Sequence, residues 1–244
     1  MALPAEGETH LWWAFPDRIH DPELLERQFA TLSAEERERQ RRFVSERDRK
    51  QFLVSHALVR HSLSHYAPVP PREWQFELNS YGRPSIREPA AWRSLRFNLS
   101  HTEGRAVVAV AWEMDIGVDV QSTVPERDLA EIAERYFSPI EIAQLRRRPE
   151  AFFDFWTLKE AYIKARGMGL SIPLDSFSFV LEDTEEPRIL FHQGCPDSPD
   201  RWRFALRRGD GYRVAVAAAG KTGRLGIVER ETVPLAESSA ARDT

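Results

Sequence analysis

Residues 154–170, DFWTLKEAYIKARGMGL, decide how the rest of this chain is organised. The stretch predicts one helix over 152–166, because Gly167 and Gly169 then stop it and Pro173 follows. At about 100° per residue, one face roughly 140° wide carries an indole, two ammonium groups and a carboxylate, from Trp156, Lys159, Glu160 and Lys164. Another side carries a core stripe made of Leu158, Tyr162 and Ala165. The polar face is either a solvated surface with a Glu160–Lys164 ion pair or a functional site.

Size and composition exclude several classes of protein. The chain has 244 residues, of which 42% are hydrophobic and 30% charged, which is typical of a globular protein of one large or two small domains. Its net charge of −4 provides no basic field for nucleic acid. The single Cys195 excludes an internal disulfide and fits a reducing compartment. There is no long apolar run and no export signal, so we expect a cytoplasmic protein without membrane association.

The predicted elements indicate an α+β fold of two similar lobes related by a pseudo-two-fold axis. Each lobe has a long helix, over 48–66 and 152–166, and a small, largely antiparallel sheet that includes a hydrophobic hairpin. We place the N-terminal lobe at 1–113 and the C-terminal lobe at 114–220, with the active groups between them. In the second lobe we expect one antiparallel sheet from segments 177–181, 188–191, 201–206 and 212–218. Residues 221–244 are expected to be a weakly ordered tail.

A carboxylate interrupts the predicted strand over 116–121, IGVDVQ. By period-2 alternation, Asp119 points away from the side on which Val118 and Val120 lie. A carboxylate in a buried strand is costly unless it is paired or binds a metal, and we favour a metal. His56, His61 and His65 follow one another at near-helical steps, but no Cys or carboxylate accompanies them, so we predict no histidine metal site.

The segment 33–50 carries seven Lys or Arg residues against five acidic ones. This composition fits either an ordinary solvated helix face or a local phosphate site, because arginine can bond phosphate oxygens through two parallel N–H groups. A turn follows later at Tyr81-Gly82-Arg83-Pro84, which suits either a plain bend or the edge of a nucleobase pocket.

Three motifs together resemble the Sfp-type 4′-phosphopantetheinyl transferases: FNLSH at 97–101, GVDVQ at 117–121 and FWTLKEAYIKARGMGL at 155–170. The family pattern has a Ser-His pair ending a strand, then G-[IV]-D-[IV]-E, then W-x-x-K-E-[AS]-x-x-K followed by G-x-G-L. The third motif is complete here, and the resemblance extends over about residues 9 to 220, including RRF at 41–43. It implies the two-lobed 4′-phosphopantetheinyl transferase fold.

The resemblance also implies a reaction. The family moves phosphopantetheine from coenzyme A onto a serine of an apo carrier protein, and leaves adenosine 3′,5′-bisphosphate. The carriers would be peptidyl or acyl carrier domains of peptide synthetases, polyketide synthases or fatty-acid synthases. The length of the chain fits the family's monomeric type. Because the chemistry is attack on a pyrophosphate, positioning and charge neutralisation supply most of the catalysis.

The resemblance also implies roles for the individual residues that match the family's motifs. Asp119 and Glu160 would hold Mg²⁺, or alternatively Mn²⁺, with Gln121 as a third ligand. The implied catalytic residues are Glu160, Lys159, Lys164 and Asp119. The implied coenzyme A contacts are Arg39 (with Arg37 or Arg42), Tyr81, Gly82, Arg83, Asn98, Ser100, His101, Lys159 and Lys164. The base that takes the serine proton would be Glu160, a metal-bound water or Glu141.

One position departs from the family pattern, because Gln121 stands where members often have Glu. An amide oxygen still ligates Mg²⁺ but brings no charge, so we expect altered metal affinity rather than loss of activity. Three alternatives stay open: an idle carrier-binding domain, a metal-dependent phosphodiesterase, and a plain nucleotide-binding module. The intact Asp119 and Glu160 argue against the first. The absence of a long basic track argues against the second, and the absence of a phosphate-loop motif against the third.

Overall fold

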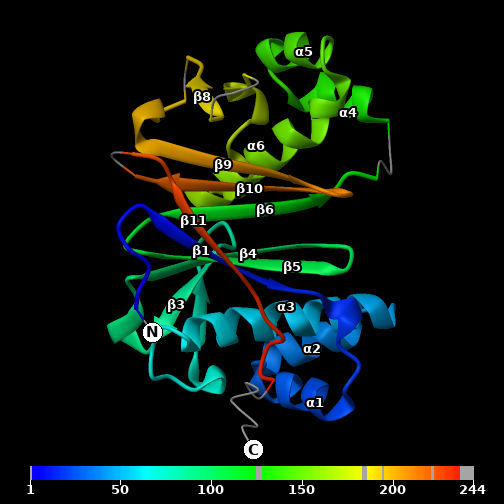
Figure 1. Ribbon diagram of the computed structural model, residues 1–244, viewed down its shortest axis with the longest axis vertical. Helices are drawn as coiled ribbons and strands as arrows, with labels where there is room; N and C mark the ends of the chain where they lie inside the picture. Colours follow the sequence, from blue (N-terminus) through cyan, green and yellow to red (C-terminus); the bar gives the residue numbers. More distant parts are fainter. Residues whose placement is uncertain (1, 125–127, 183–185, 194, 221–222, 237–244) are drawn as a thin grey trace, which may run out of the picture.

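The computed structural model describes residues 2–124, 128–182, 186–193, 195–220 and 223–236. Two sheets and two long helices stack in layers: helix α3 (Glu46–Ser64), the sheet β11-β1-β5-β4, the sheet β6-β10-β9, and helix α6 (Phe152–Arg166) (Figure 1). Each sheet therefore has one face on a helix and one face on the other sheet. The sequence prediction of an α+β fold with two helix-backed lobes is confirmed.

The two lobes repeat the same order of elements. The N-terminal lobe contains β1 (Glu8–Ala14), α1 (Pro22–Thr31), α2 (Ala34–Arg42), α3, β2 (Gln75–Leu78), β3 (Pro84–Glu88), β4 (Leu95–Thr102) and β5 (Arg105–Trp112). The C-terminal lobe contains β6 (Ile116–Ser122), α4 (Leu129–Tyr136), α5 (Pro139–Leu145), α6, β7 (Phe177–Val180), β8 (Arg188–Phe191), β9 (Trp202–Gly209) and β10 (Tyr212–Ala219). In both lobes the first strand pairs antiparallel with the last strand of the hairpin, β1 with β5 and β6 with β10. This shared topology is the pseudo-two-fold relation that the sequence suggested.

Alternation along β6 decides what each side chain faces. Val118 and Val120 are buried in the core between the two sheets, together with Leu11 of β1 and other apolar side chains. The intervening residues face α6, and at Gly117 an added Cβ would meet the backbone of that helix. Asp119 therefore points out of the apolar layer toward α6, as its period-2 position predicted.

Side chains rather than backbone groups join the two lobes along one edge. β6 pairs with β10 on one side, and on its other side its N–H groups are met by alternate side chains of β4. The bonds run from Val118 N–H to Asn98 Oδ1 (2.9 Å), from Val120 N–H to Ser100 Oγ (3.1 Å) and from Ser122 N–H to Thr102 Oγ1 (3.2 Å). This seam satisfies backbone donors that a free edge strand would leave open, and it places the FNLSH motif against the GVDVQ motif.

Two expectations about the C-terminal lobe were wrong. The segments 177–181 and 188–191 do not join the main sheet, because β7 and β8 form a separate two-stranded sheet packed on α5 and α6. Residues 223–236 are not a loose tail either. β11 (Gly226–Glu231) crosses back to the N-terminal lobe and pairs in parallel with β1 (Figure 1). An exposed β1 edge accepts this strand, and composition alone did not reveal it. The prediction for residues 237–244 lies outside the described residues.

Candidate active site

The close approach of α6 to β6 builds the site. An added Cβ at Gly117 would lie 2.1 Å from the carbonyl oxygen of Ala161 and 2.4 Å from the amide nitrogen of Ala165. Only glycine lets the helix backbone rest on the strand at this distance. Lys164 and Glu160, one turn apart on α6, are thereby brought over the strand position that carries Asp119.

Asp119 is the most constrained acidic group of the site, with only 6% of its surface exposed. Its Oδ1 accepts hydrogen bonds from Lys164 Nζ at 2.7 Å and from Ser100 Oγ at 2.9 Å. Its Oδ2 is buried and has no partner among the described residues. Because a buried carboxylate oxygen without a partner is costly, this atom is suited to ligate a cation.

Glu160 is half-buried and close enough to Asp119 for the two carboxylates to interact. Burial raises the pKa of Glu160, the Asp119 charge raises it further, and the Lys164 ammonium opposes both effects. Within the described residues no third His, Cys, Asp or Glu joins them as a metal-binding group. By strand alternation Gln121 lies on the same side of β6 as Asp119, so the candidate oxygen donors are two carboxylates and one amide. This donor set fits Mg²⁺.

His101 stands near the end of β4, close enough to Asp119 and Lys164 to interact with both. The residue is exposed to solvent, but the surrounding protein desolvates its ring in part and lowers its pKa. The charges of Lys164 and His56 lower the pKa further, Arg39 adds to their effect, and Asp119 opposes them. The cations Arg39 of α2 and Lys164 of α6 and the imidazoles of His56 and His101 therefore lie near one another, an arrangement that suits a phosphate-bearing ligand.

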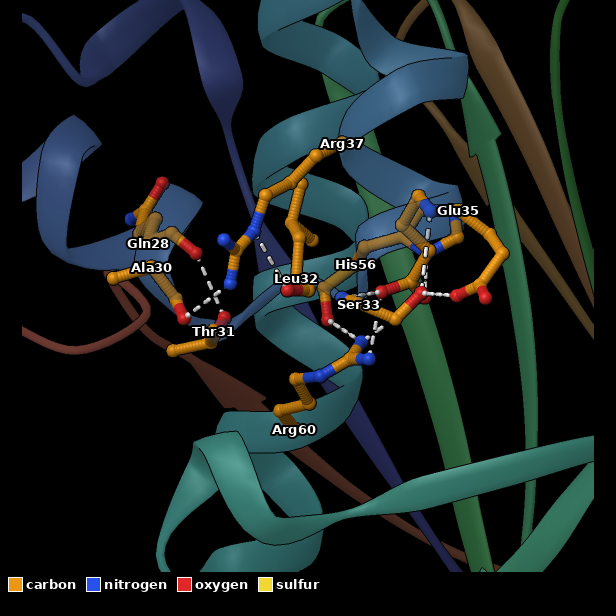
Figure 2. Close-up of polar contacts among 10 residues, drawn as sticks. Gln28, Ala30, Thr31, Leu32, Ser33, Glu35, Arg37, His56 and Arg60 are labelled. Atoms are coloured by element: carbon orange, nitrogen blue, oxygen red, sulfur yellow. Dashed lines mark hydrogen bonds and ion pairs between the residues drawn. The ribbon is translucent and has the colours of Figure 1, made fainter.

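Glu36 fixes the helix that carries Arg39. It closes a capping box with Ser33 at the start of α2, and it accepts bonds from His56 Nδ1 (2.9 Å) and Arg60 Nη2 (2.7 Å) of α3. Figure 2 shows His56 and Arg60 converging beside Ser33. Although burial works to raise the pKa of Glu36, its bond to His56 and the Arg60 charge lower it to about 2. Glu36, ionised near neutral pH, therefore ties α2 to α3.

The structure separates the three arginines that were candidates for the phosphate site. Arg37 donates from Nε to the Leu32 carbonyl at 2.9 Å, at the end of α1 (Figure 2). Arg42 pairs with Glu38 at 2.5 Å. Arg39 contacts only the ring of Phe52, at 5.6 Å, among the described residues. Its guanidinium N–H groups therefore stay available to a ligand.

Comparison with known proteins identifies the chain. Residues 115–217 match the family described as "4'-phosphopantetheinyl transferase superfamily", and residues 21–113 match "4'-phosphopantetheinyl transferase, N-terminal". The chain is 36% identical over 220 residues to the 4'-phosphopantetheinyl transferase HetI of Nostoc sp., an alignment that covers 87% of this chain and 88% of the relative. It belongs to the Sfp-type 4′-phosphopantetheinyl transferase family. Sfp of Bacillus subtilis is 34% identical over 216 residues, which is 86% of this chain and 92% of Sfp.

Solved structures overlap this family member only in part. Holo-[acyl-carrier-protein] synthase of Thermotoga maritima is 26% identical, with a TM-score of 0.35 over 44% of this chain and 64% of that one. The Helicobacter pylori enzyme, solved in complex with coenzyme A, is 20% identical, with a TM-score of 0.35 over 43% of this chain and 99% of that one. In the described part of the chain, no helix combines the length and hydrophobicity needed to cross a membrane.

Lys159 does not face the site, contrary to the role that the family motif implied. Its ammonium is fully buried on the other side of α6, where it contacts Glu141 Oε2 (2.8 Å) and the carbonyl oxygens of Leu174 (2.6 Å) and Phe177 (2.9 Å). Burial lowers its pKa, and Glu141 opposes that shift. The prediction for Lys159 was wrong because α6 is buried on nearly all sides, so a charged residue on this helix does not mark a solvent-exposed face.

The same contact removes Glu141 as a candidate base, because its carboxylate is fully buried against Lys159 and caps the start of α5 through Ser138. Asn98 also does not face a ligand. It is 5% exposed, and its amide oxygen accepts from Val118 in the seam between the lobes. Ser100 does lie at the site, where it bonds both Asp119 and Lys164.

The predicted adenine turn forms one wall of a small cavity. Gly82 has a φ of +85°, and Asn79 Oδ1 accepts from the N–H groups of Tyr81 and Arg83, both at 2.9 Å. A cavity of about 180 Å³ lies between this turn and β4, and it is lined by Asn79, Arg83, Pro84, Ser85, Ile86, Leu95, Arg96 and Phe97. Neither Asn79 nor Gly117 was predicted from the sequence to be a site residue. A glycine inside a strand pattern was the available signal for the second.

Proposed function

We propose that this transferase moves 4′-phosphopantetheine from coenzyme A to a serine of an apo carrier protein in a Mg²⁺-dependent reaction centred on Asp119 and Glu160. The serine oxygen forms a bond to the β-phosphorus, the pyrophosphate P–O bond breaks, and adenosine 3′,5′-bisphosphate departs. Membership of the family supports this class of reaction. The buried, unpartnered Asp119 Oδ2 beside Glu160 is the observation that supports the residue assignment.

Asp119, Glu160 and the Gln121 amide would hold the Mg²⁺, with Mn²⁺ as the alternative ion. When bound, the ion neutralises charge on the pyrophosphate oxygens. It would also relieve the repulsion between the two carboxylates that raises the pKa of Glu160. Lys164, held at 2.7 Å from Asp119, brings a second positive charge to the same place.

Glu160 is the base in this proposal, because its carboxylate faces the site and makes no hydrogen bond within the described residues. On the coenzyme A side, His101 would bind a phosphate and Arg39 the 3′-phosphate. Both are exposed, and they act electrostatically on one another. The cavity beside Gly82 and Arg83 would receive the adenine.

The acceptors would be peptidyl or acyl carrier domains, and the working form a monomer in the cytoplasm. The monomer is supported by the way the site is assembled, because β4 of one lobe and β6 and α6 of the other meet within a single chain. No partner chain is required to supply Ser100, Asp119 or Lys164.

Intact-mass spectrometry of an apo carrier protein tests the proposal. We expect the carrier to gain one phosphopantetheine when incubated with the protein, coenzyme A and Mg²⁺, and to gain nothing with EDTA or with Glu160→Gln. Glu26→Gln, an exposed carboxylate on α1, is the matched control and should transfer as well as wild type. No mass gain on peptidyl and acyl carriers alike, with coenzyme A still bound, would contradict the proposal and favour the idle carrier-binding domain.

A further inference from the structure

The turn between β2 and β3 reaches across the lobes to the end of α6. Arg83 Nη1 donates to the Ala165 carbonyl at 2.7 Å, and its Nη2 donates to the Ile116 carbonyl at 3.3 Å. Asn79 Nδ2 donates to the Gly167 carbonyl at 2.7 Å. Two side chains of the N-terminal lobe thus hold three carbonyl groups of the C-terminal lobe.

These bonds supply hydrogen-bond donors to carbonyl groups at the C-terminus of α6. The last carbonyls of a helix have no partner within it. At this end, the Gly167 N–H meets the carbonyls of Ile163 and Lys164, while Ala165 and Gly167 receive their donors from Arg83 and Asn79. The positive guanidinium also lies at the negative end of the helix dipole.

The fit between turn and helix end is close. Gly167 has a φ of +65°, and an added Cβ there would lie 2.5 Å from Arg83 Cδ. The Arg83 side chain is 19% exposed, and its charge lies 3.9 Å from Asp115. Asn79 does two things at once, because its oxygen shapes the turn through Tyr81 and Arg83 while its nitrogen holds the helix.

We propose that Asn79 and Arg83 are positioning residues for the transfer reaction. They fix the end of α6, and with it Lys164 and Glu160, relative to the turn beside the cavity that would take the adenine. Coenzyme A bound at the turn would therefore order the helix that carries the reactive groups. This inference rests on the proposed function.

Hydrogen exchange followed by mass spectrometry tests, without any turnover, whether the turn and the end of α6 are coupled. Steady-state kinetics test the effect of this coupling on transfer. The variants are Arg83→Ala, Arg83→Lys and Asn79→Asp. Asn79→Asp keeps the oxygens that shape the turn and loses the donor to Gly167. Arg87→Ala is the matched control, because Arg87 is exposed on β3 and bonds Gln75 within the same hairpin.

In Arg83→Ala and Asn79→Asp we expect the last turn of α6 to exchange about tenfold faster than in wild type. We expect kcat to fall about tenfold, because small displacements of reactive groups are costly in positioned reactions. The Kd for coenzyme A of Asn79→Asp should stay within about threefold of wild type, because its turn is intact. Arg83→Lys should recover part of the kcat. Arg87→Ala should change neither the exchange rate at the end of α6 nor kcat.

Wild-type exchange in both variants would overturn the inference. So would faster exchange with unchanged kcat, since the contacts would then be structural only. Failure of this inference can be distinguished from failure of the proposed function, because hydrogen exchange does not depend on turnover. If wild type transfers nothing, but coenzyme A slows exchange at the end of α6 in wild type and not in Arg83→Ala, the coupling stands and the proposed reaction fails.

Discussion

The two lobes have the same topology but put different residues between strand and helix. In the N-terminal lobe, Trp12 of β1 faces α3 and fills the layer together with Leu58 and Tyr66. In the C-terminal lobe, Gly117 and Asp119 of β6 face α6, and the helix backbone rests on the strand. α3 consequently packs mainly on β5, whereas α6 packs directly on β6.

This difference shows how one of two similar lobes can contain reactive groups that the other lobe lacks. A large indole closes the space that, in the other lobe, contains Asp119, Lys164 and Glu160. The N-terminal lobe instead contributes the positive charge of Arg39 on α2 and a turn that reaches the end of α6. In the proposed reaction the first lobe binds the nucleotide and the second carries out the transfer.

The largest expected effect comes from the acidic pair of the C-terminal lobe. We expect Glu160→Gln and Asp119→Asn each to lower kcat by at least about 10³-fold, because both remove charge on which metal binding depends. Burial raises the pKa of Glu160, so a neutral amide there should leave the melting temperature unchanged or higher. Transfer assays and thermal unfolding check both parts. Near-wild-type turnover at matched Mg²⁺ would remove these residues from the site.

The second effect concerns the close approach that distinguishes β6 from β1. Gly117→Ala should lower the free energy of unfolding by about 2–3 kcal/mol, because the new methyl group overlaps the backbone of α6. The matched control is Gly226→Ala on β11, where the nearest atom to an added Cβ is 3.6 Å away. Denaturant unfolding measures both. Equal stability of the two variants would mean that α6 moves away without cost.

The third effect tests the binding role of the N-terminal lobe. Arg39→Ala should raise the KM for coenzyme A about tenfold and leave kcat within about twofold, because it removes a ground-state phosphate contact. Arg42→Ala, whose guanidinium is paired with Glu38, serves as the control and should leave the KM within about twofold. If Arg39→Ala lowers kcat instead, the division between a binding lobe and a reacting lobe does not hold.

The fourth effect concerns the departure from the family pattern on β6. Gln121→Glu adds a third carboxylate beside Asp119 and Glu160, so the Mg²⁺ concentration for half-saturation should fall about fivefold to tenfold. Calorimetric titration with Mg²⁺ measures this without turnover. Unchanged Mg²⁺ affinity would show that residue 121 does not face the ion.

The smallest expected effect concerns His65 in the N-terminal lobe. His65 contacts Trp12, and its Nε2 is buried without a partner among the described residues. Burial, with help from Arg230, lowers the pKa of His65 from 6.5 to about 4. The unfolded chain therefore takes up this proton first, and stability is complete above about pH 6.5 and declines as the pH falls toward 4.

One proton contributes at most about 1.4 kcal/mol per pH unit, and partial exposure of the His65 ring reduces this. His65→Gln should therefore flatten the dependence of unfolding free energy on pH between these limits, whereas the exposed His20→Gln should not. Parallel pH profiles for wild type and His65→Gln would contradict the assignment.

Much of the architecture could be predicted from local signals. The helix over 152–166 is found with the predicted bounds, because the glycines that follow it mark its end. The motif residues Asp119, Lys164, Ser100 and His101 do come together, as the resemblance implied. Periodicity failed where burial is nearly complete, as for Lys159, and composition failed where a segment joins a distant edge, as for β11.

The sequence by itself determined the family, the lobes, and the acidic and basic groups that meet between them, because those properties reside in contiguous motifs and local spacing. Only the tertiary structure decided which of the three arginines has no hydrogen-bond partner among the described residues, that Lys159 turns inward to Glu141, and that Asn79 and Arg83 hold the end of α6. Each of these depends on which donor finds which acceptor across segments remote in the chain. Hydrogen-bond satisfaction across a packed interface is a property of the whole fold.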